Sequence, residues 1–223
     1  MKNNLSKRIV TSLLILVLLS ISLFINKYFW LILLLIVSII SFNEFNNLIK
    51  IAYKKEKKLV NILNIISIFY LIFFIYAAYN QYANFIDLIL ILSICIFSDT
   101  GGFIVGKLIG GKKLTIISPN KTIAGSLGSF LFSLFPLIIL LIINKIPTIK
   151  LELILADLTI MVFISLFLSF ICQSGDLFIS YFKRKAKVKD TGSILPGHGG
   201  LLDRIDGVIF VIPAAFTVDK LFF

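Results

Sequence analysis

The sequence has too few cysteines and histidines for a metal site built on either residue. Its 223 residues include two cysteines and one histidine. Cys95 and Cys172 lie far apart in apolar segments, so their spacing fits neither a zinc motif nor a disulfide framework. We expect both to be buried packing residues. His198 has no second histidine as a partner, which disfavours a histidine-metal site.

Acidic residues are also scarce: 11 stand against 22 lysines and arginines, giving a formal net charge of +11. Such an excess can indicate binding to nucleic acid. Here the basic residues fall in short segments between apolar runs, where lipid headgroups and membrane topology account for them better. We therefore expect membrane lipids, and no nucleic acid, as partners. No fixed-period repeat, low-complexity tract or soluble linker is present.

Apolar residues are abundant, at 59% of the chain with 22 phenylalanines and a mean hydropathy of +1.04. One soluble core cannot bury so many, which predicts an all-α, polytopic integral membrane protein forming a single domain over residues 1–223. Seven runs are long enough to span a bilayer: 9–26, 28–48, 59–79, 86–106, 123–144, 151–172 and 206–223. The first is alternatively a signal peptide, because Ser20-Ile-Ser22 is a small-x-small pattern after basic residues.

The basic residues predict the orientation of these runs. With the N-terminus inside, the inner segments hold eighteen of the 22 lysines and arginines, and the outer ones hold Lys27, Lys145, Lys150 and Lys220. This positive-inside bias places the 107–122 and 173–205 loops in the cytosol, where soluble substrates can reach them.

Three aspartates at predicted membrane edges are candidate ligands of a metal ion. Asp176 follows the sixth apolar run, and Asp203 and Asp206 lie on one helix face at the start of the seventh. Carboxylates at such depth are costly unless partnered, and hard oxygen ligands suit magnesium. The alternative is that Asp203 and Asp206 only cap a helix and offset its dipole.

The segment between these aspartates combines a glycine-rich turn with basic residues. In Leu195-Pro-Gly-His-Gly-Gly200, the glycines allow backbone N–H groups to approach an anion, although such turns are often plain connectors. We expect His198 to contact phosphate or to make a hydrogen bond that stabilises the loop. Lys183, Arg184, Lys187 and Lys189 are either topology signals or part of a polyphosphate site.

A second candidate segment runs from residue 98 to 125. Its glycines do not follow the Walker pattern and no predicted strand precedes them, which disfavours a P-loop NTPase. Gly102, Gly106 and Gly110 recur every four residues, as in a close helix-packing stripe. Ser118-Pro-Asn-Lys-Thr122 is harder to explain by packing, and it offers a lysine and hydroxyls to phosphate.

Taken together, these motifs resemble the phosphatidate cytidylyltransferase (CDP-diacylglycerol synthase) family. The resemblance covers roughly residues 95–210, while the first three apolar runs resemble it only in hydropathy. The motifs that carry it are Ser98-Asp99, Gly106, Ser118-Pro-Asn-Lys-Thr122, Gln173-x-Gly-Asp176-Leu177, Ser180-x-x-Lys183-Arg184, Lys189-Asp190, Leu195-Pro-Gly-His-Gly-Gly200 and Asp203-Arg204-x-Asp206.

The resemblance implies transfer of CMP from CTP to phosphatidic acid, giving CDP-diacylglycerol and pyrophosphate. It implies magnesium at Asp176, Asp203 and Asp206, which with Lys183 form the catalytic set, and it allows a second cation such as potassium. Residues 1–94 would be N-terminal spans and 95–223 the catalytic part of a multi-pass protein of the plasma (inner) membrane. Homodimers are common in that family. The implied substrate-binding residues are Ser118, Asn120, Lys121, Thr122, Arg184, Lys189, His198, Gly199, Gly200 and Arg204.

Four positions depart from the family's usual pattern. Ile179 and Ala124 stand where glutamates are common, Phe103 replaces a tyrosine and Lys107 replaces an arginine. These departures bear on nucleotide contacts and leave the three aspartates intact.

Two alternative functions remain. One is a CTP transferase acting on another lipid phosphate. The other is a cation-coupled transporter, whose carboxylates usually lie near the membrane midplane in related repeats. The three aspartates lie instead at the predicted cytosolic ends of spans and no paired repeat is present, which favours the enzyme.

Overall fold

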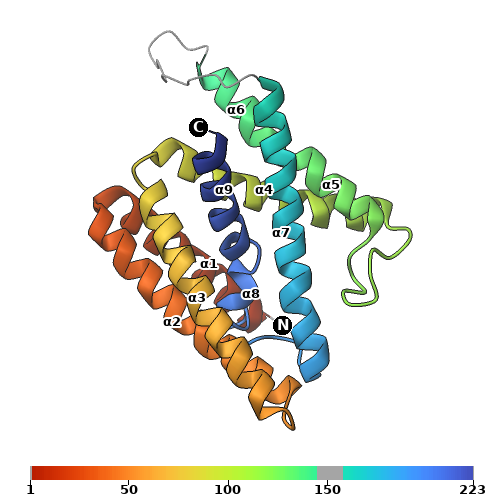
Figure 1. The fold of residues 1–223 in the computed structure, drawn as a ribbon. Helices are drawn as coiled ribbons and strands as arrows, with labels where there is room; N and C mark the ends of the chain where they lie inside the picture. The colour runs from red at the N-terminus through yellow and green to blue at the C-terminus, as the bar shows by residue number, and fades with distance from the viewer. Residues whose placement is uncertain (1, 145–157, 223) are drawn as a thin grey trace. The chain divides into compact units, whose positions relative to one another are not determined.

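The computed structural model describes residues 2–144 and 158–222. The start of the predicted 151–172 span, together with Lys145 and Lys150, lies outside the described residues. The helices are α1 (Lys2–Ile25), α2 (Lys27–Ala52), α3 (Lys57–Gln81), α4 (Phe85–Ile109), α5 (Ile123–Ser133), α6 (Phe135–Asn144), α7 (Leu158–Ala186), α8 (Leu202–Ile205) and α9 (Val208–Phe222) (Figure 1).

The all-helical prediction is confirmed for these residues. They contain two isolated β-bridges and no named strand. Within the described ranges, five segments are long and apolar enough to cross a membrane, namely α2, α3, α4, residues 123–143 and α7. The apolar part of α1, Val10–Ile25, and the 15-residue α9 are shorter. The prediction of a multi-pass membrane protein is thus supported, while the number of seven spans stays a prediction.

The chain divides into two compact units, and each is described by itself. Unit 1 comprises Met1–Asn84 with Phe178–Asp206, and unit 2 comprises Phe85–Leu177 with Gly207–Phe223. The division passes through α7, between Leu177 and Phe178. The separate roles predicted for residues 1–94 and 95–223 stay predictions.

In unit 1, α2 and α3 pack side by side as a helical hairpin (Figure 1). The indole N–H of Trp30 on α2 donates to the carbonyl of Ala78 on α3 at 2.9 Å. Towards the other end of the hairpin, a hydrophobic cluster joins the end of α7 to both helices; its buried members are Leu48, Ile49, Val60, Phe182 and Ala186. This cluster fixes the end of α7 relative to α2.

The predicted start of the 173–205 loop is wrong, because residues 173–186 belong to α7, which continues to Ala186. Ile179, Phe182 and Ala186 are buried at helical spacing, so three further turns gain apolar contacts. The helix ends in a Schellman motif: Lys187 has a φ of 58°, and the N–H groups of Lys187 and Val188 donate to the carbonyls of Arg184 and Lys183. Asp176 and Lys183 therefore lie within a helix.

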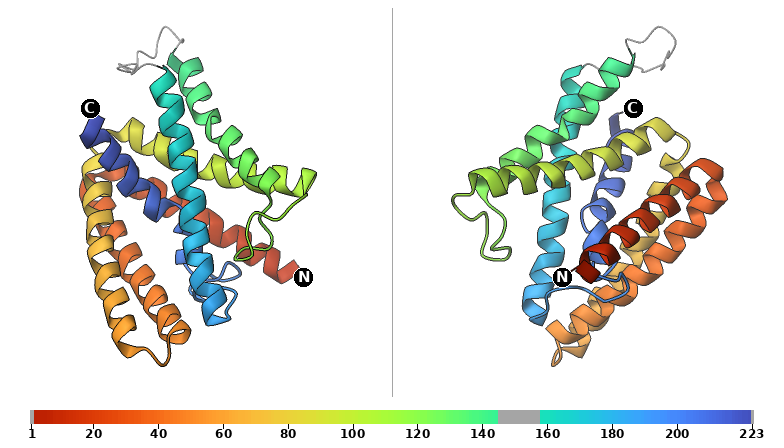
Figure 2. Two further views of the ribbon diagram at one scale, coloured as in Figure 1. Left: turned by 45° about the vertical axis from the view of Figure 1, so that its right-hand side comes forward. Right: turned by 180° about the vertical axis from the view of Figure 1, so that it is seen from behind.

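In unit 2, α4 and α5 lie side by side (Figure 2). Small residues allow this approach, since a Cβ at Gly101 would meet Phe132 and the carbonyl of Gly128. Gly102 and Gly106 face Gly125 in the same contact, which confirms the helix-packing stripe at these two positions. Gly110 does not belong to it: it has a φ of +65° just after α4, and a Cβ there would meet nothing within 4 Å.

Hydroxyl groups join α7 to α4 and α5 within unit 2. Ser98 on α4 and Ser169 on α7 are hydrogen-bonded at 2.8 Å, and both side chains are buried. Ser126 on α5 donates to Gln173 on α7 at 2.6 Å. Neither Cys95 nor Cys172 forms a disulfide and both are buried, which agrees with the prediction that they are packing residues.

Candidate functional site

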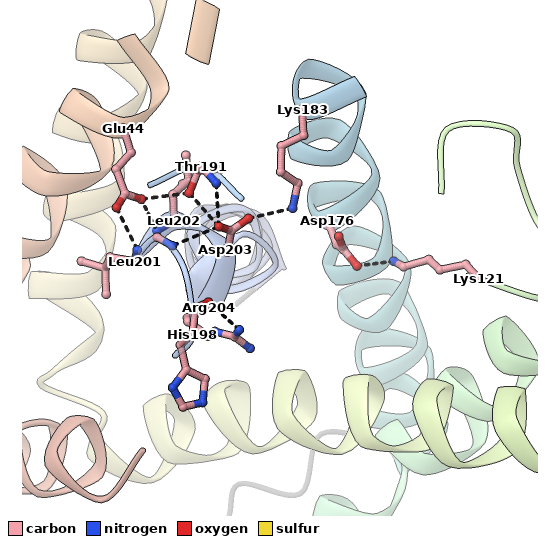
Figure 3. A network of polar contacts seen from close by, with 11 residues as sticks. Glu44, Lys121, Asp176, Lys183, Thr191, His198, Leu201, Leu202, Asp203 and Arg204 are labelled. Atoms are coloured by element: carbon pink, nitrogen blue, oxygen red, sulfur yellow. Dashed lines mark hydrogen bonds and ion pairs between the residues drawn. The ribbon is translucent and has the colours of Figure 1, made fainter. Parts of the chain in front are cut away.

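In unit 1, Lys183 and Asp203 form an ion pair, with Nζ 2.7 Å from Oδ1 and side chains that are only 13% and 7% exposed. The other oxygen, Oδ2, accepts the Thr191 N–H at 2.7 Å, the Thr191 hydroxyl at 3.0 Å and the Gly200 N–H at 3.2 Å (Figure 3). Burial by itself raises the pKa of the Asp203 carboxyl, but the hydrogen bonds from Lys183 and Thr191 outweigh it, so that this pKa lies below its ordinary value. Asp203 is thus a carboxylate held in one orientation.

A second carboxylate, Glu44 on α2, binds the same segment and is 4% exposed. Its Oε1 accepts the Leu201 N–H at 3.0 Å, and its Oε2 accepts the Leu202 N–H at 2.8 Å and the Thr191 hydroxyl at 3.0 Å (Figure 3). The first N–H groups of a helix have no acceptor within the helix. At the start of α8, the Glu44 carboxylate accepts two of these N–H groups, those of Leu201 and Leu202.

The glycine-rich turn is closed by its own backbone. Leu195 donates to the Gly199 carbonyl at 2.9 Å, and the N–H of Gly199 donates back to Leu195 at 3.1 Å. Gly197 and Gly199 have φ values of +80° and +88°, where a side chain would strain the backbone. The Gly200 N–H donates to the Asp203 carboxylate. The N–H groups of Gly199 and Gly200, both predicted to bind a ligand, are therefore hydrogen-bonded within the protein. Arg204 adds a further closure, donating to the His198 carbonyl at 2.7 Å.

The His198 ring lies against α1. Its Nδ1 is 2.6 Å from the Thr11 hydroxyl and its Nε2 is 3.3 Å from the Ser12 hydroxyl. Two roles were predicted for this residue, and these contacts support the loop-stabilising hydrogen bond. Contact with phosphate stays a prediction.

In unit 2, Lys121 and Asp176 form an ion pair of 2.5 Å (Figure 3). Each side chain is just over one quarter exposed, at 27% and 29%. Asp99 on α4 interacts electrostatically with both, and its Oδ1 accepts the Cys172 thiol at 3.7 Å. Two carboxylates and one ammonium group therefore gather in unit 2.

The Ser118–Thr122 segment leads into α5. The Lys121 N–H donates to the Ser118 carbonyl at 3.1 Å, forming a turn. Thr122 is the N-cap of α5, since its Oγ1 accepts the Gly125 N–H at 3.0 Å. Asn120 is exposed, as are Arg184 and Lys189 in unit 1.

The predicted metal ligands belong to both units: Asp176 lies in unit 2, and Asp203 and Asp206 lie in unit 1. Among the described residues, no group of three or more His, Cys, Asp or Glu side chains is placed to hold a metal ion. The assignment of magnesium to these three aspartates stays a prediction.

Sequence reasoning missed Glu44 and left Asp99 out of the site. Glu44 and Asp99 each lie inside an apolar run, where a carboxylate is costly unless it has partners. Had every acidic residue within an apolar run been taken as a candidate, both would have been selected.

Comparison with known proteins agrees with the earlier resemblance. Phosphatidate cytidylyltransferases of Staphylococcus saprophyticus and Staphylococcus aureus are 43% and 44% identical over 118 residues, which is 52% of this chain and 42% of each relative. The Bacillus subtilis protein of the same name is 42% identical over 126 residues, or 56% of this chain and 44% of the relative. The chain thus aligns with less than half the length of these curated relatives. The model of the cytidylyltransferase family matches residues 59–222, and the chain belongs to that family.

Proposed function

We propose that this protein is a phosphatidate cytidylyltransferase. A phosphate oxygen of phosphatidic acid bonds to the α-phosphorus of CTP, the bond to the β-phosphate breaks, and CDP-diacylglycerol and pyrophosphate are formed. The observation that carries the proposal is that the family match over 59–222 includes both ion pairs, Lys121–Asp176 and Lys183–Asp203. The names of the curated relatives specify the lipid.

The basic residues would bind and orient CTP. Lys121 and Lys183 are each held by a carboxylate, which restricts their long side chains before substrate arrives. Exposed Arg184, Lys189 and Arg204 offer further positive charge to the phosphates. Catalysis of this reaction needs alignment and charge neutralisation rather than a covalent nucleophile. Ser118, Asn120 and Thr122 supply polar groups beside Lys121.

The acidic residues fit a hard cation in their chemistry. Among the residues that the structure describes, Asp203 Oδ1 accepts one donor and Oδ2 accepts three, so Oδ1 retains a lone pair for a metal. Asp176, Asp203 and Asp206 would hold magnesium, with potassium as a candidate second cation. When bound, the metal would neutralise phosphate charge and favour pyrophosphate as the leaving group.

The proposal includes a location. Phosphatidic acid lies in the bilayer and CTP in the cytosol, so the polar segments would face the cytosolic side of a plasma (inner) membrane, with the N-terminus on the same side. The excess of basic residues in these segments supports that orientation. Seven spans and a homodimer belong to the same proposal.

The test is direct. Purified protein would be given radiolabelled CTP, magnesium and phosphatidic acid, and CDP-lipid formation would be followed. A parallel reaction with an isoprenoid-ether lipid phosphate separates the alternative substrate class. Formation of CDP-lipid with phosphatidic acid supports the proposal, and product only with the other lipid would assign the enzyme to that substrate.

A further inference from the structure

Glu44 is a buried acid within the apolar helix α2, and both its oxygens accept hydrogen bonds. Burying an ionised carboxylate is costly unless hydrogen bonds replace water. Here the replacement comes from the Leu201 and Leu202 N–H groups and the Thr191 hydroxyl, at 2.8–3.0 Å. These donors lie 147 to 158 residues later in the chain. The carboxylate therefore ties α2 to the segment that carries the candidate site.

The segment is shaped to fit this carboxylate. A Cβ at Gly192 would meet the Glu44 carboxyl group, and a Cβ at Gly200 would meet Glu44 Oε2 and the Thr191 hydroxyl. Only glycine leaves room for the acid at these two positions. The residues around the site and Glu44 thus form one packed unit.

Thr191 connects Glu44 to Asp203. Its hydroxyl oxygen lies 3.0 Å from Glu44 Oε2 and 3.0 Å from Asp203 Oδ2. A hydroxyl has one proton, so the two carboxylates share a single donor. The Thr191 and Gly200 N–H groups also bind Asp203 Oδ2, which directs Oδ1 to Lys183. This chain of contacts connects Glu44 to the Asp203 carboxylate.

We propose that Glu44 is a positioning residue for the transferase reaction, which sets Asp203 and Lys183 in their working orientation through Thr191 and the start of α8. Its importance for catalysis rests on the proposed function. Glu44 precedes residues 59–222, so it lies outside the part of the chain that the family model matches. The resemblance of the sequence motifs, which begins near residue 95, does not include it either.

The first experiment measures structure alone. Hydrogen exchange of the intact protein in lipid nanodiscs would be compared for wild type, Glu44→Gln and Ser41→Ala. Ser41 is the matched control, because it is buried on α2 one turn earlier and its hydroxyl has no hydrogen-bond partner among the described residues. Glutamine keeps the size of Glu44 but replaces one acceptor oxygen with a donor. We expect exchange at Leu201 and Leu202 to rise at least about tenfold in Glu44→Gln, since hydrogen bonds to charged groups are the stronger ones.

The pattern of exchange decides the structural step. Faster exchange confined to residues 190–206 supports local positioning. Unchanged exchange there would overturn the proposal, and so would a uniform increase that includes α3. If Glu44→Gln does not accumulate in the membrane, Thr191→Val takes its place, because it removes the shared hydroxyl at similar size.

The second experiment measures catalysis. Both Glu44→Gln and Thr191→Val should lower kcat at least about tenfold, while the KM for CTP stays within about threefold. Glu44 does not itself contact the nucleotide in this account, and loss of supporting contacts typically costs 10–100-fold. The double variant should be no worse than the poorer single one, because both act through the same contacts. Additive losses, or a normal kcat in Glu44→Gln, would contradict the proposal.

The two experiments separate two kinds of failure. If wild-type protein makes no CDP-lipid, the proposed function fails, and the exchange data still decide whether Glu44 orders the 190–206 segment. If wild type is active and Glu44→Gln is equally active despite faster exchange, the proposed function stands and the positioning role in catalysis is wrong.

Discussion

The ammonium group of Lys183 lies 2.7 Å from Asp203 Oδ1, which joins the end of α7 to α8 within one compact unit. Asp203 is therefore more than a candidate metal ligand, because it also holds a lysine and the backbone of Thr191 and Gly200. Asp206, three residues later, is the C-cap of α8. The two aspartates are expected to differ in what they contribute to stability.

Substitution of each aspartate by asparagine tests this difference. We expect Asp203→Asn and Asp206→Asn each to reduce turnover more than about 100-fold, as befits direct metal ligands, since loss of supporting groups alone costs 10–100-fold. Asp203→Asn should also lower the free energy of unfolding by about 2–3 kcal/mol, because an amide cannot satisfy four donors as a carboxylate does. Activity assays and thermal unfolding measure the two effects.

Asp219→Asn, at a half-exposed position on α9, is the control. Near-wild-type turnover in both site variants would remove them from the metal site.

Lys121→Ala separates binding from stability in unit 2. Its ion pair with Asp176 is partly exposed, so its loss should cost at most about 1 kcal/mol of unfolding free energy. The KM for CTP should rise at least about tenfold if this lysine contacts phosphate. Initial-rate kinetics over a range of CTP concentrations measure the change. Lys112→Ala, an exposed residue of the same loop, should leave the KM unchanged. If the KM for CTP is the same in both variants, Lys121 does not contact the nucleotide, and its charge serves only to orient the chain in the membrane.

His198 and Thr11 provide a test of the glycine-rich turn. The hydrogen bond of 2.6 Å between them predicts that His198→Ala and Thr11→Val have similar effects, each a loss of about 1 kcal/mol of unfolding free energy. The KM for CTP should stay within about twofold in both. A KM that rises only in His198→Ala would show that the imidazole contacts the nucleotide instead.

Two glycines of α4 should differ in their response to alanine. A Cβ at Gly101 would enter Phe132 and the carbonyl of Gly128, whereas one at Gly106 would only approach Thr122 and Gly125 at 3.2–3.4 Å. Gly101→Ala should therefore lower the unfolding free energy by about 1–3 kcal/mol, as overpacking does. Gly106→Ala should have a smaller effect, because its neighbours need to move only slightly. Equal unfolding temperatures for the two variants would refute the close packing of α4 on α5.

The helices could be predicted from the sequence because apolar runs of this length have few alternatives. The end of α7 could not, because the predicted apolar run ended at residue 172, before the polar Gln173-Ser-Gly-Asp176. Burial of Phe182 and Ala186 against α2 extends the helix there, and this contact is distant in the sequence.

The candidate site was predictable in its residue types and only partly in its contacts. Asp203 and Lys183 were both selected from motifs, but their mutual ion pair was not expected. Glu44 had no local motif at all. Its partners are two backbone N–H groups and the Thr191 hydroxyl, 147 to 158 residues later in the chain, and contacts at this separation leave no local pattern.

Formation of CDP-lipid by the purified protein is the most direct test of the central claim. Wild-type protein with radiolabelled CTP, phosphatidic acid and magnesium should give labelled CDP-diacylglycerol and an equal amount of pyrophosphate, and chelation of magnesium should stop the reaction. An absence of labelled lipid from correctly folded wild-type protein, across a range of magnesium and lipid concentrations, would contradict the claim.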